Sequence, residues 1–338
     1  MRLNTLWSAA LVLGTACTSE QASTDPSPGE STFSDLSAPT RPRGVVENVQ
    51  TPSAWGVAVR DDGLAYFTEL LDGGVGIVST KSRALSGFIP TGGLPTGIVF
   101  APDGKRAYVA NQSGSVSVLD VASRAVVGSL AVDQPLAVRV SPDGRQLFVA
   151  TGVSTLLVVD IATLAVVRTI ELGFSPNGFA VHPDGRRLYV SGFVGLSGFV
   201  DGMVSEIDMV SGSVLRSFTV GDTPQEMALD HRGTRLYVAN EGPLAGGGGY
   251  LTEIPLQTGL PSAPIALQGG GFGVGITPDD AEAYISIPSA GVVQIFKLQN
   301  RRLTKTIQVG GSPRRIAFSQ RGSVAAVTNQ DGFISFVH

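Results

Sequence analysis

A repeated segment of about forty residues dominates this sequence and limits what the chain can fold into. Two clear copies read PTGIVFAPDGKRAYVANQSGSVSVLDVASRAVVGSLAV from Pro95 and PLAVRVSPDGRQLFVATGVSTLLVVDIATLAVVRTIEL from Pro135. Equivalent starting positions recur through the rest of the chain at intervals of 40 to 48 residues. Seven units begin at these positions, which we call anchors: Ala54, Pro95, Pro135, Pro176, Pro224, Gly271 and Pro313.

All units have the same internal order. Four short runs rich in Val, Ile, Leu and aromatic residues are separated by turn residues, and helical spacing is absent. Four antiparallel strands in forty-odd residues are typical of one blade of a β-propeller. We therefore predict an all-β fold, a seven-bladed β-propeller with four antiparallel strands in each blade. The PDG tripeptides at 102–104, 142–144 and 183–185 follow the first run of their units and predict two-residue hairpin connections.

The seventh unit is shorter than the others, because it supplies three strands from Pro313 and ends at FISFVH. The segment GVVENVQ at 44–50 resembles two fourth strands, AVVGSLA at 125–131 and AVVRTIE at 165–171. It also precedes the first unit, as every fourth strand precedes the next blade. We therefore predict that residues 44–50 complete the last blade and close the ring, which removes a pair of exposed sheet edges.

The second strand of several units ends in a recurrent tetrapeptide. It reads Tyr-Val-Ala-Asn at 108–111 and at 237–240, and Ala-Val-Thr-Asn at 326–329. In these motifs the chain resembles the YVTN-repeat β-propellers, also called the YncE-like or surface-layer family, over residues 44 to 338. The resemblance implies a propeller. It leaves the function open, because proteins of this family range from cell-surface modules to enzyme-like relatives.

The first residues of the chain have the pattern of an export signal. Residues 1–16 combine Arg2 with an apolar run from Leu6 to Leu13, which predicts a signal peptide. Cys17 follows at once and resembles the lipid-acceptor cysteine of bacterial lipoproteins, although Gly14 stands where that family prefers Leu. The alternative is an ordinary cleaved signal followed by an incidental cysteine.

A Ser-, Thr- and Pro-rich segment separates this signal from the repeats. Residues 17–43 lack periodicity and predict a flexible stalk that begins with the lipidated cysteine. The propeller would then occupy residues 44–338. We expect an exported protein anchored to the bacterial cell envelope, facing the periplasm or the cell surface.

The charge balance narrows the classes of partner. Only 15% of the residues are charged and the formal net charge is −4, whereas a nucleic-acid-binding protein presents a basic face. A hydrophobic content of 43% argues against a disordered acidic protein. We expect a monomer that binds no nucleic acid and meets the membrane only through its lipid. Its partner would be an envelope protein, a glycan or a small molecule.

The first strand of each unit is expected to line the central channel, and its residues alternate in size. The third and fifth residues after the anchor are large, as at Ile98 and Phe100, and the second and fourth are mostly small. Successive strand residues point to opposite faces, so each inner strand offers a bulky face to one neighbouring blade and a slim face to the other. The slim set has three charged exceptions: Arg139, Glu226 and Arg315.

These three charged residues have two interpretations. An isolated buried charge is strongly unfavourable, so the side chains must reach solvent in the channel or pair with partners. The first interpretation is a water-filled channel with a structural ion pair. The second is a binding site for a polar ligand.

Strand direction places further polar residues on one face of the ring. The start of the first strand and the end of the second lie at the same end of a blade, because the two are antiparallel. Trp55, Asn177, Gln225 and Phe272 are expected at this face, and loops at 192–202 and 240–250 should rise from it. The candidate ligand-binding residues are Arg139, Glu226, Arg315, Arg314, Glu69, Asn111, Asn240 and Asn329.

The sequence contains no recognisable catalytic or metal-binding motif. Its histidines are His182, His231 and His338, and no HExxH, paired-cysteine, GxSxG or phosphate-loop pattern is present. We therefore predict no metal and no cofactor, and assign no catalytic residue.

Three functional hypotheses follow. The preferred one is a binding or interaction module on the envelope that works through one face and the central channel. The second is a lactonase-like hydrolase, because some similar propellers open lactone rings with acids and arginines at the channel mouth. The third is a structural surface protein without a ligand. The hydrolase would draw on these residues: Glu226, Glu69, Arg139, Arg314 and Arg315.

Overall fold

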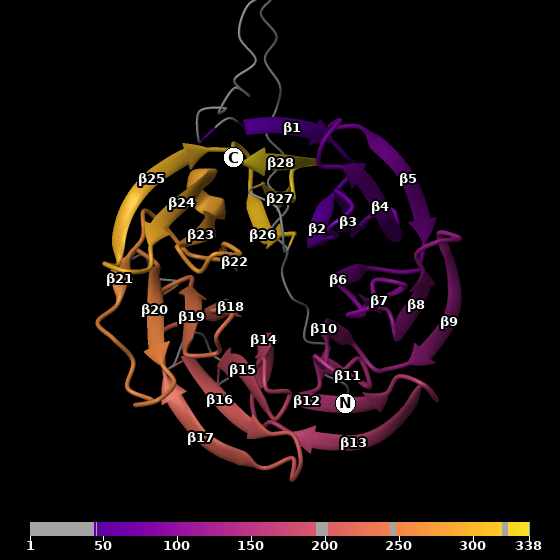
Figure 1. Cartoon of the computed structure of the whole chain (residues 1–338), viewed down its shortest axis with the longest axis horizontal. Coiled ribbons are helices and arrows are strands. Elements are labelled where there is room, and N and C mark those ends of the chain that lie inside the picture. Colours follow the sequence, from indigo (N-terminus) through magenta and orange to yellow (C-terminus); the bar gives the residue numbers. More distant parts are fainter. Residues whose placement is uncertain (1–43, 45, 194–201, 244–247, 320–323, 338) are drawn as a thin grey trace, which may run out of the picture. The chain divides into compact units, whose positions relative to one another are not determined.

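The repeats form a propeller, as predicted. The computed structural model describes residues 44, 46–193, 202–243, 248–319 and 324–337. These residues form seven four-stranded antiparallel sheets, arranged one after another around a ring (Figure 1). In this part of the chain no helix has the length and apolar character needed to cross a bilayer.

We number the blades 1 to 7 in chain order. Blades 1 to 3 contain β2 (Ala54–Val59), β3 (Leu64–Glu69), β4 (Gly74–Ser79), β5 (Leu85–Pro90), β6 (Pro95–Phe100), β7 (Arg106–Asn111), β8 (Ser115–Asp120), β9 (Ala125–Ala131), β10 (Pro135–Val140), β11 (Gln146–Thr151), β12 (Thr155–Asp160) and β13 (Ala165–Glu171). Blades 4 and 5 contain β14 (Ser175–Val181), β15 (Arg187–Phe193), β16 (Gly202–Asp208), β17 (Val214–Thr219), β18 (Pro224–Leu229), β19 (Arg235–Asn240), β20 (Tyr250–Pro255) and β21 (Ile265–Ala266). Blades 6 and 7 contain β22 (Val274–Ile276), β23 (Glu282–Ile287), the 3-10 turn η1 (Pro288–Ala290), β24 (Val292–Lys297), β25 (Arg302–Gln308), β26 (Pro313–Phe318), β27 (Ala325–Asn329), β28 (Phe333–Val337) and β1 (Val46–Gln50).

The hydrophobic core lies between adjacent blades. The second and third strands are almost wholly buried, as in β7 and β8, so both of their faces need apolar side chains. Between blades 1 and 2, for example, Tyr66 and Ile77 share a cluster with Ile98. The tyrosine of the recurrent tetrapeptide belongs to this core, since Tyr108 and Tyr237 are 0% and 2% exposed.

The N-terminal strand closes the ring, as predicted. β1 pairs with β28 from Val46 opposite Val337 to Gln50 opposite Phe333, and Figure 1 shows the two strands side by side. Val49 is buried in the cluster that joins blade 7 to blade 1. Within the described residues the strand begins at Val46.

The slim faces of the inner strands allow the blades to touch near the axis. A Cβ atom added to Gly56 would lie 2.8 Å from the carbonyl oxygen of Thr96 in the next blade. One added to Gly178 would lie 2.6 Å from the carbonyl oxygen of Gln225. Both distances are shorter than a side-chain carbon tolerates, so glycine is needed where successive inner strands meet.

A β-bulge interrupts the inner strand just after the anchor. In blade 7, Pro313 faces Asn329 and Ile316 faces Val327, which leaves Arg314 and Arg315 opposite the single residue Thr328. Register shifts occur at the equivalent place in blades 1 to 5. Such a bulge re-aims side chains that would otherwise alternate between the two faces of the sheet.

A hydroxyl group on the second strand bridges three blades to the blades that follow them. The Thr328 hydroxyl accepts from the N–H of Arg315 at 3.0 Å and donates to the carbonyl of Trp55 at 2.6 Å. Ser191 links the N–H of Gly178 to the carbonyl of Gln225 in the same way, and Ser286 links Gly273 to Arg314. Because these polar groups lie between blades, the bridges satisfy donors and acceptors that water would otherwise have to serve.

The PDG segments do not form two-residue hairpin loops, so that prediction was wrong. Between β6 and β7 the N–H of Ala101 bonds the carbonyl of Arg106, and four residues, 102–105, form the loop. Gly104 adopts a φ of 66°, and the carboxylate of Asp103 accepts the N–H of Lys105. The proline fixes φ early in a type I-like turn, which needs the extra residues before the chain can reverse.

Blade 6 departs from the expected strand start. Its regular strand β22 begins at Val274, three residues after the anchor Gly271. Gly271 instead bonds the carbonyl of Asn240, and the carbonyl of Phe272 accepts from Glu226. Phe272 and Gly273 also bond Ser286 of their own blade, so the run of glycines lets the backbone contact blade 5 before it joins its own sheet.

Ring closure makes a testable prediction. A chain that starts at Ala54 should unfold at a lower temperature than one that starts at Gly44. In the shorter chain β28 has lost its pairing with the five residues of β1, and the apolar cluster that Val49 covers is exposed to water. Hydrogen exchange should show faster exchange of the β28 amides in the shorter chain. Equal melting temperatures and equal β28 exchange in the two chains would contradict closure by β1.

Candidate functional site

The three charged exceptions come together near the axis. Glu226 Oε1 lies 2.9 Å from Arg315 Nη1 and 3.3 Å from Arg139 Nη2. The residues belong to β10, β18 and β26, the inner strands of blades 3, 5 and 7. We call this group the channel triad. It spans blades that are not neighbours, and slim residues such as Gly178 and Gly273 in the blades between leave room for it.

The channel triad is partly buried and carries an excess of positive charge. The side chains of Arg139, Arg315 and Glu226 are 29%, 18% and 10% exposed. Burial lowers the pKa of Arg139, the carboxylate of Glu226 opposes this, and Arg315 adds to the lowering. Two guanidinium groups and one carboxylate leave a net charge of +1 when all three are ionised.

A second group of side chains adjoins the triad. The Arg314 guanidinium carbon lies 5.0 Å from the centroid of the Trp55 ring and 4.5 Å from that of Phe272. The two rings are 5.8 Å apart and nearly perpendicular. Arg314 Nε and Nη2 donate to Gln330 Oε1 at 3.0 and 2.5 Å. We call Trp55, Phe272 and Arg314 the aromatic–arginine cluster.

The bulge of blade 7 explains how the two groups meet. Adjacent residues of a regular strand point to opposite faces. Arg314 and Arg315 nevertheless both contact the ring of Phe272, at 4.5 and 5.4 Å. Burial lowers the pKa of Arg314, Glu241 opposes this lowering, and Arg315 adds to it. Two cations thus contact one aromatic ring, and each such contact is favourable when the ring is partly shielded from water.

The three candidate asparagines lie at the expected end of the second strands but outside these two groups. Asn111, Asn240 and Asn329 pair with the anchors Pro95, Pro224 and Pro313, and all three are buried. Their amide groups bond within the protein, for example Asn111 Nδ2 to Ser117 Oγ at 2.9 Å, Asn240 Nδ2 to Thr252 Oγ1 at 3.0 Å and Asn329 Nδ2 to the carbonyl of Gly310 at 2.8 Å. These bonds fasten the turn after the second strand to its surroundings, so we leave the asparagines out of the proposed site.

Glu69 occupies the same place in blade 1 and is also separate from the channel triad. It is 4% exposed. Burial raises its pKa from an ordinary value of 4.5 to about 7, and Asp72 adds to the rise by repulsion and by a hydrogen bond. Blade 1 therefore has a carboxyl group at the position where blades 2, 5 and 7 have the neutral amide of an asparagine.

Part of the expected loop face lies outside the described residues. This holds for 194–201 of the first loop and for 244–247 of the second. From the described part of the second loop, Glu241 accepts a hydrogen bond from Gln225 at 2.7 Å. Among the described residues no group of three or more His, Cys, Asp or Glu side chains could hold a metal ion.

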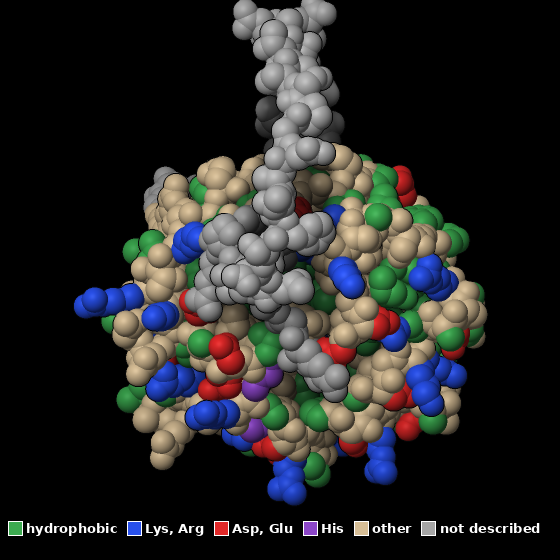
Figure 2. All heavy atoms as spheres, turned by 45° about the horizontal axis from the view of Figure 1, so that its top comes forward, with side chains coloured by type: hydrophobic (Ala, Val, Ile, Leu, Met, Phe, Trp, Pro, Cys, Tyr) green, Lys and Arg blue, Asp and Glu red, His purple; other side chains and the backbone are tan. Residues whose placement is uncertain are grey.

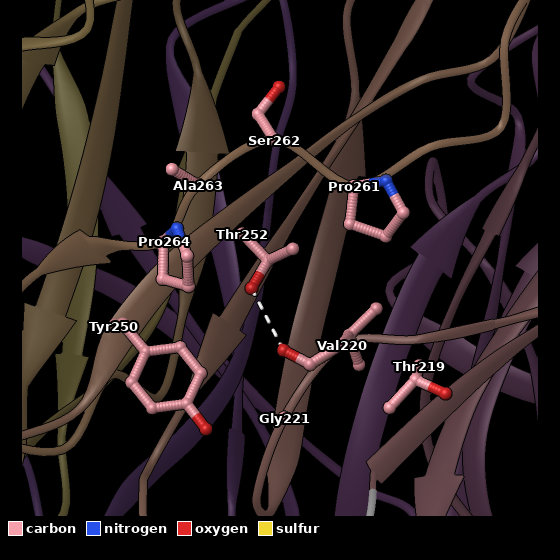
Figure 3. A pocket seen from close by; sticks show the side chains of 9 residues that line it. All are labelled: Thr219, Val220, Gly221, Tyr250, Thr252, Pro261, Ser262, Ala263 and Pro264. Carbon is pink, nitrogen blue, oxygen red and sulfur yellow. Dashed lines mark hydrogen bonds between the residues drawn. The ribbon is translucent and has the colours of Figure 1, made fainter.

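Blade 5 also carries a hollow at its outer edge, because β21 has only two residues. The cavity of about 370 Å³ lies between Val220, Tyr250 and the loop 261–264 (Figure 3). No charged residue lines it. Its polar groups are bonded within the protein: Thr252 donates to the carbonyl of Val220 at 3.0 Å, and the Tyr250 hydroxyl accepts the N–H of Asp222. The cavity therefore has few polar groups that could select a polar ligand.

The face of the molecule shown in Figure 2 has no concentration of one charge. Lys and Arg side chains are spread along the visible rim, with Asp and Glu between them (Figure 2). Among the described residues, two further buried glutamates are each paired with two arginines, Glu206 with Arg187 and Arg216, and Glu253 with Arg235 and Arg301. The channel triad differs from these groups in that it joins the inner strands of three blades.

Comparison with known proteins supports the fold. The chain matches no family model and no curated protein. It is similar to the solved structure of hydrazine synthase from Kuenenia stuttgartiensis, with a TM-score of 0.77 and 19% identity over 90% of this chain and 99% of that one. It is also similar to the β-propeller domain of Cps50 (Swd1) from Myceliophteria thermophila, with a TM-score of 0.70 and 12% identity over 86% of this chain and 99% of that one. At these identities the likeness shows the propeller fold alone.

Replacing Glu69 with asparagine should change how stability depends on pH. A carboxyl group whose pKa is raised on folding favours the folded state below its unfolded pKa, and that contribution is lost as pH rises towards 7. The free energy of unfolding of Glu69→Asn minus that of the natural protein should therefore rise between pH 4.5 and 7 and level off above.

Urea unfolding of both proteins at a series of pH values measures this difference. Asn111→Asp, which places an acid at the matching position of blade 2, should show the opposite trend. A Glu69→Asn difference that stays constant from pH 4.5 to 8 would contradict the raised pKa.

Proposed function

We propose that the chain is a binding module whose ligand contacts the channel triad and the aromatic–arginine cluster. The observation that carries the proposal is that Arg139, Glu226 and Arg315 meet near the axis. They come from blades 3, 5 and 7, which are not adjacent in the ring. Arg314 lies beside them and contacts two aromatic rings. Cationic, anionic and aromatic groups within one small region are the usual content of a polar ligand site.

The energetic cost of these charges supports a functional role. Equivalent positions in other blades hold glycine or alanine, for example Gly56, Gly97 and Ala180. The fold therefore closes without charges at these positions. Taking three ionised groups out of water costs free energy that their mutual attraction only partly offsets, and apolar replacements of such groups are often neutral or stabilising. A ligand that uses the charges accounts for that cost.

The geometry favours binding over hydrolysis. A general base must be free to accept a proton from a water or substrate within about 3 Å. Glu226 Oε1 is held by two guanidinium groups, and Glu226 Oε2 is buried. Glu69 does not contact the triad and faces Asp72 instead. Glu226 Oε2 has no hydrogen-bond partner, but its burial keeps it from the water that the base of a lactonase would have to activate.

Ligand screening by thermal unfolding tests the proposal. A small molecule that binds the folded state should raise its melting temperature, by an amount equivalent to about 2.7 kcal/mol at one hundred times its Kd. Arg314→Ala should abolish the rise, because it removes the cation held between Trp55 and Phe272. Arg106→Ala, an exposed arginine at the start of β7, should leave the rise unchanged.

The screen should include sugar lactones, because their turnover or lack of turnover distinguishes a hydrolase from a binding module. Turnover of a lactone by the natural protein, lost in Glu226→Gln, would overturn the binding proposal in favour of hydrolysis. A stabilising ligand whose effect is the same in Arg314→Ala would place the site elsewhere.

We propose further that the protein is exported and anchored to the cell envelope through Cys17, and that it belongs with the YVTN-repeat propellers. The signal-like residues 1–16 and the following cysteine support export and lipidation. The motifs at 108–111 and 237–240 support the family. A stalk of about twenty-five residues would leave the propeller free to meet a ligand away from the membrane surface.

Lipid attachment at Cys17 has a direct test. Cells given radioactive palmitate should label the natural protein and should not label Cys17→Ala, because this is the only thiol in the chain. Cys17→Ser, which keeps the size of the side chain, should also remain unlabelled. Equal labelling of the natural and variant proteins would refute the anchor.

A further inference from the structure

We propose, on the basis of the proposed function, that the ligand of the axial site is a small planar carboxylate of the benzoate type. Its carboxylate would bind the arginines of the channel triad, and its ring would lie against Trp55. The charge of the triad, the unused donors of its arginines and the position of the aromatic rings each support this class.

The charge of the triad selects a monoanion. With all three groups ionised the triad carries +1, and the carboxylate of Glu241 opposes the charge of the adjoining Arg314. One ligand carboxylate therefore brings the sum to zero. A phosphate monoester near −2 would leave excess negative charge in a region where the side chain of Glu226 is only 10% exposed. A neutral ligand would leave the positive charge uncompensated.

The arginines retain donors for such an anion. Among the described residues, the Arg315 side chain pairs with Glu226 through Nη1, and Arg139 uses Nη1 and Nη2. Arg315 keeps its Nε–Nη2 edge, which can bind a carboxylate with two parallel hydrogen bonds, the strong geometry for this pair. Arg139 has only Nε outside its contacts with Val138 and Glu226. The exposed fractions of Arg315 and Arg139, 18% and 29%, show that solvent reaches them.

The aromatic rings select a flat ligand body. Phe272 lies 5.4 Å from the Arg315 guanidinium and 5.8 Å from the ring of Trp55. Phe272 is buried, whereas Trp55 is partly exposed. We place the ring that is attached to a carboxylate on Arg315 against the partly exposed Trp55, where edge-to-face or offset stacking adds to binding.

Trp55 also supplies the probe for the experiment. The chain has two tryptophans, Trp7 and Trp55, so Trp7→Phe leaves Trp55 as the sole tryptophan fluorophore. In this full-length variant, benzoate should change Trp55 emission in a saturable manner, and calorimetry should give the same Kd. Benzamide, which lacks the charge, and acetate, which lacks the ring, should each bind at least about tenfold more weakly.

Variants test the role of the arginines. Arg315→Ala should weaken benzoate binding by about tenfold or more, and Arg106→Ala should leave it unchanged. If Arg315→Ala does not fold, Arg315→Lys keeps the charge and should still weaken benzoate several-fold, because it loses the planar fork. Unchanged affinity in a folded Arg315 variant would overturn the assignment.

The outcomes separate the ligand class from the binding function. Equal affinity for benzoate and benzamide, or for benzoate and acetate, would overturn the planar-carboxylate class. A different result would be that benzoate has no effect while another compound stabilises the natural protein and does not stabilise Arg314→Ala. This result would support the proposed binding function and refute a planar carboxylate as the ligand. If no compound acts in either assay, both proposals fall.

Discussion

The structure depends on hydrogen bonds that join the inner strand of one blade to that of the next. Ser191 and Thr328 each accept the N–H of a bulge residue in their own blade, and Ser286 accepts that of Gly273, just before β22. All three hydroxyls donate to a carbonyl in the following blade. At glycines such as Gly56 and Gly178 successive inner strands almost touch, so a side chain at these positions would collide with the next blade. A hydroxyl is small enough to fit and polar enough to satisfy both backbones. The ring is therefore held near its axis by polar contacts and farther out by apolar clusters.

The same contacts position the candidate site. The carbonyls that receive the bridging hydroxyls belong to Gln225, Arg314 and Trp55, which are the residues directly after three anchors. The bulge that creates the bridge also turns Arg314 and Arg315 towards one ring, that of Phe272. Charge is thus concentrated at a place where the backbone is already fixed by its neighbours. A site on inner strands of this kind is pre-organised, which lowers the entropic cost of binding.

The repeats predict the blades because hydrophobic periodicity and repeat length are properties of the chain itself. They also predict β1, since residues 44–50 resemble other fourth strands. The pattern marked Arg139, Glu226 and Arg315 as exceptions, but their meeting depends on contacts between blades far apart in sequence. The bulges were missed, because a single unpaired residue leaves no trace in an alternating pattern; the recurrent Ser or Thr at 191, 286 and 328 was the available signal. The PDG turns were misread because a two-residue loop and a four-residue loop use the same residue types.

The most direct measurement of this account is the unfolding of Thr328→Val, compared with Thr328→Ser. Valine keeps the shape of threonine but leaves the N–H of Arg315 and the carbonyl of Trp55 without the hydroxyl. We predict a loss of about 1–3 kcal/mol in the free energy of unfolding and a changed Trp55 emission in the Trp7→Phe background, with Thr328→Ser close to the natural protein. A Thr328→Val protein with unchanged stability and unchanged Trp55 emission would contradict the claim that the hydroxyl bridges hold the ring and its axial site.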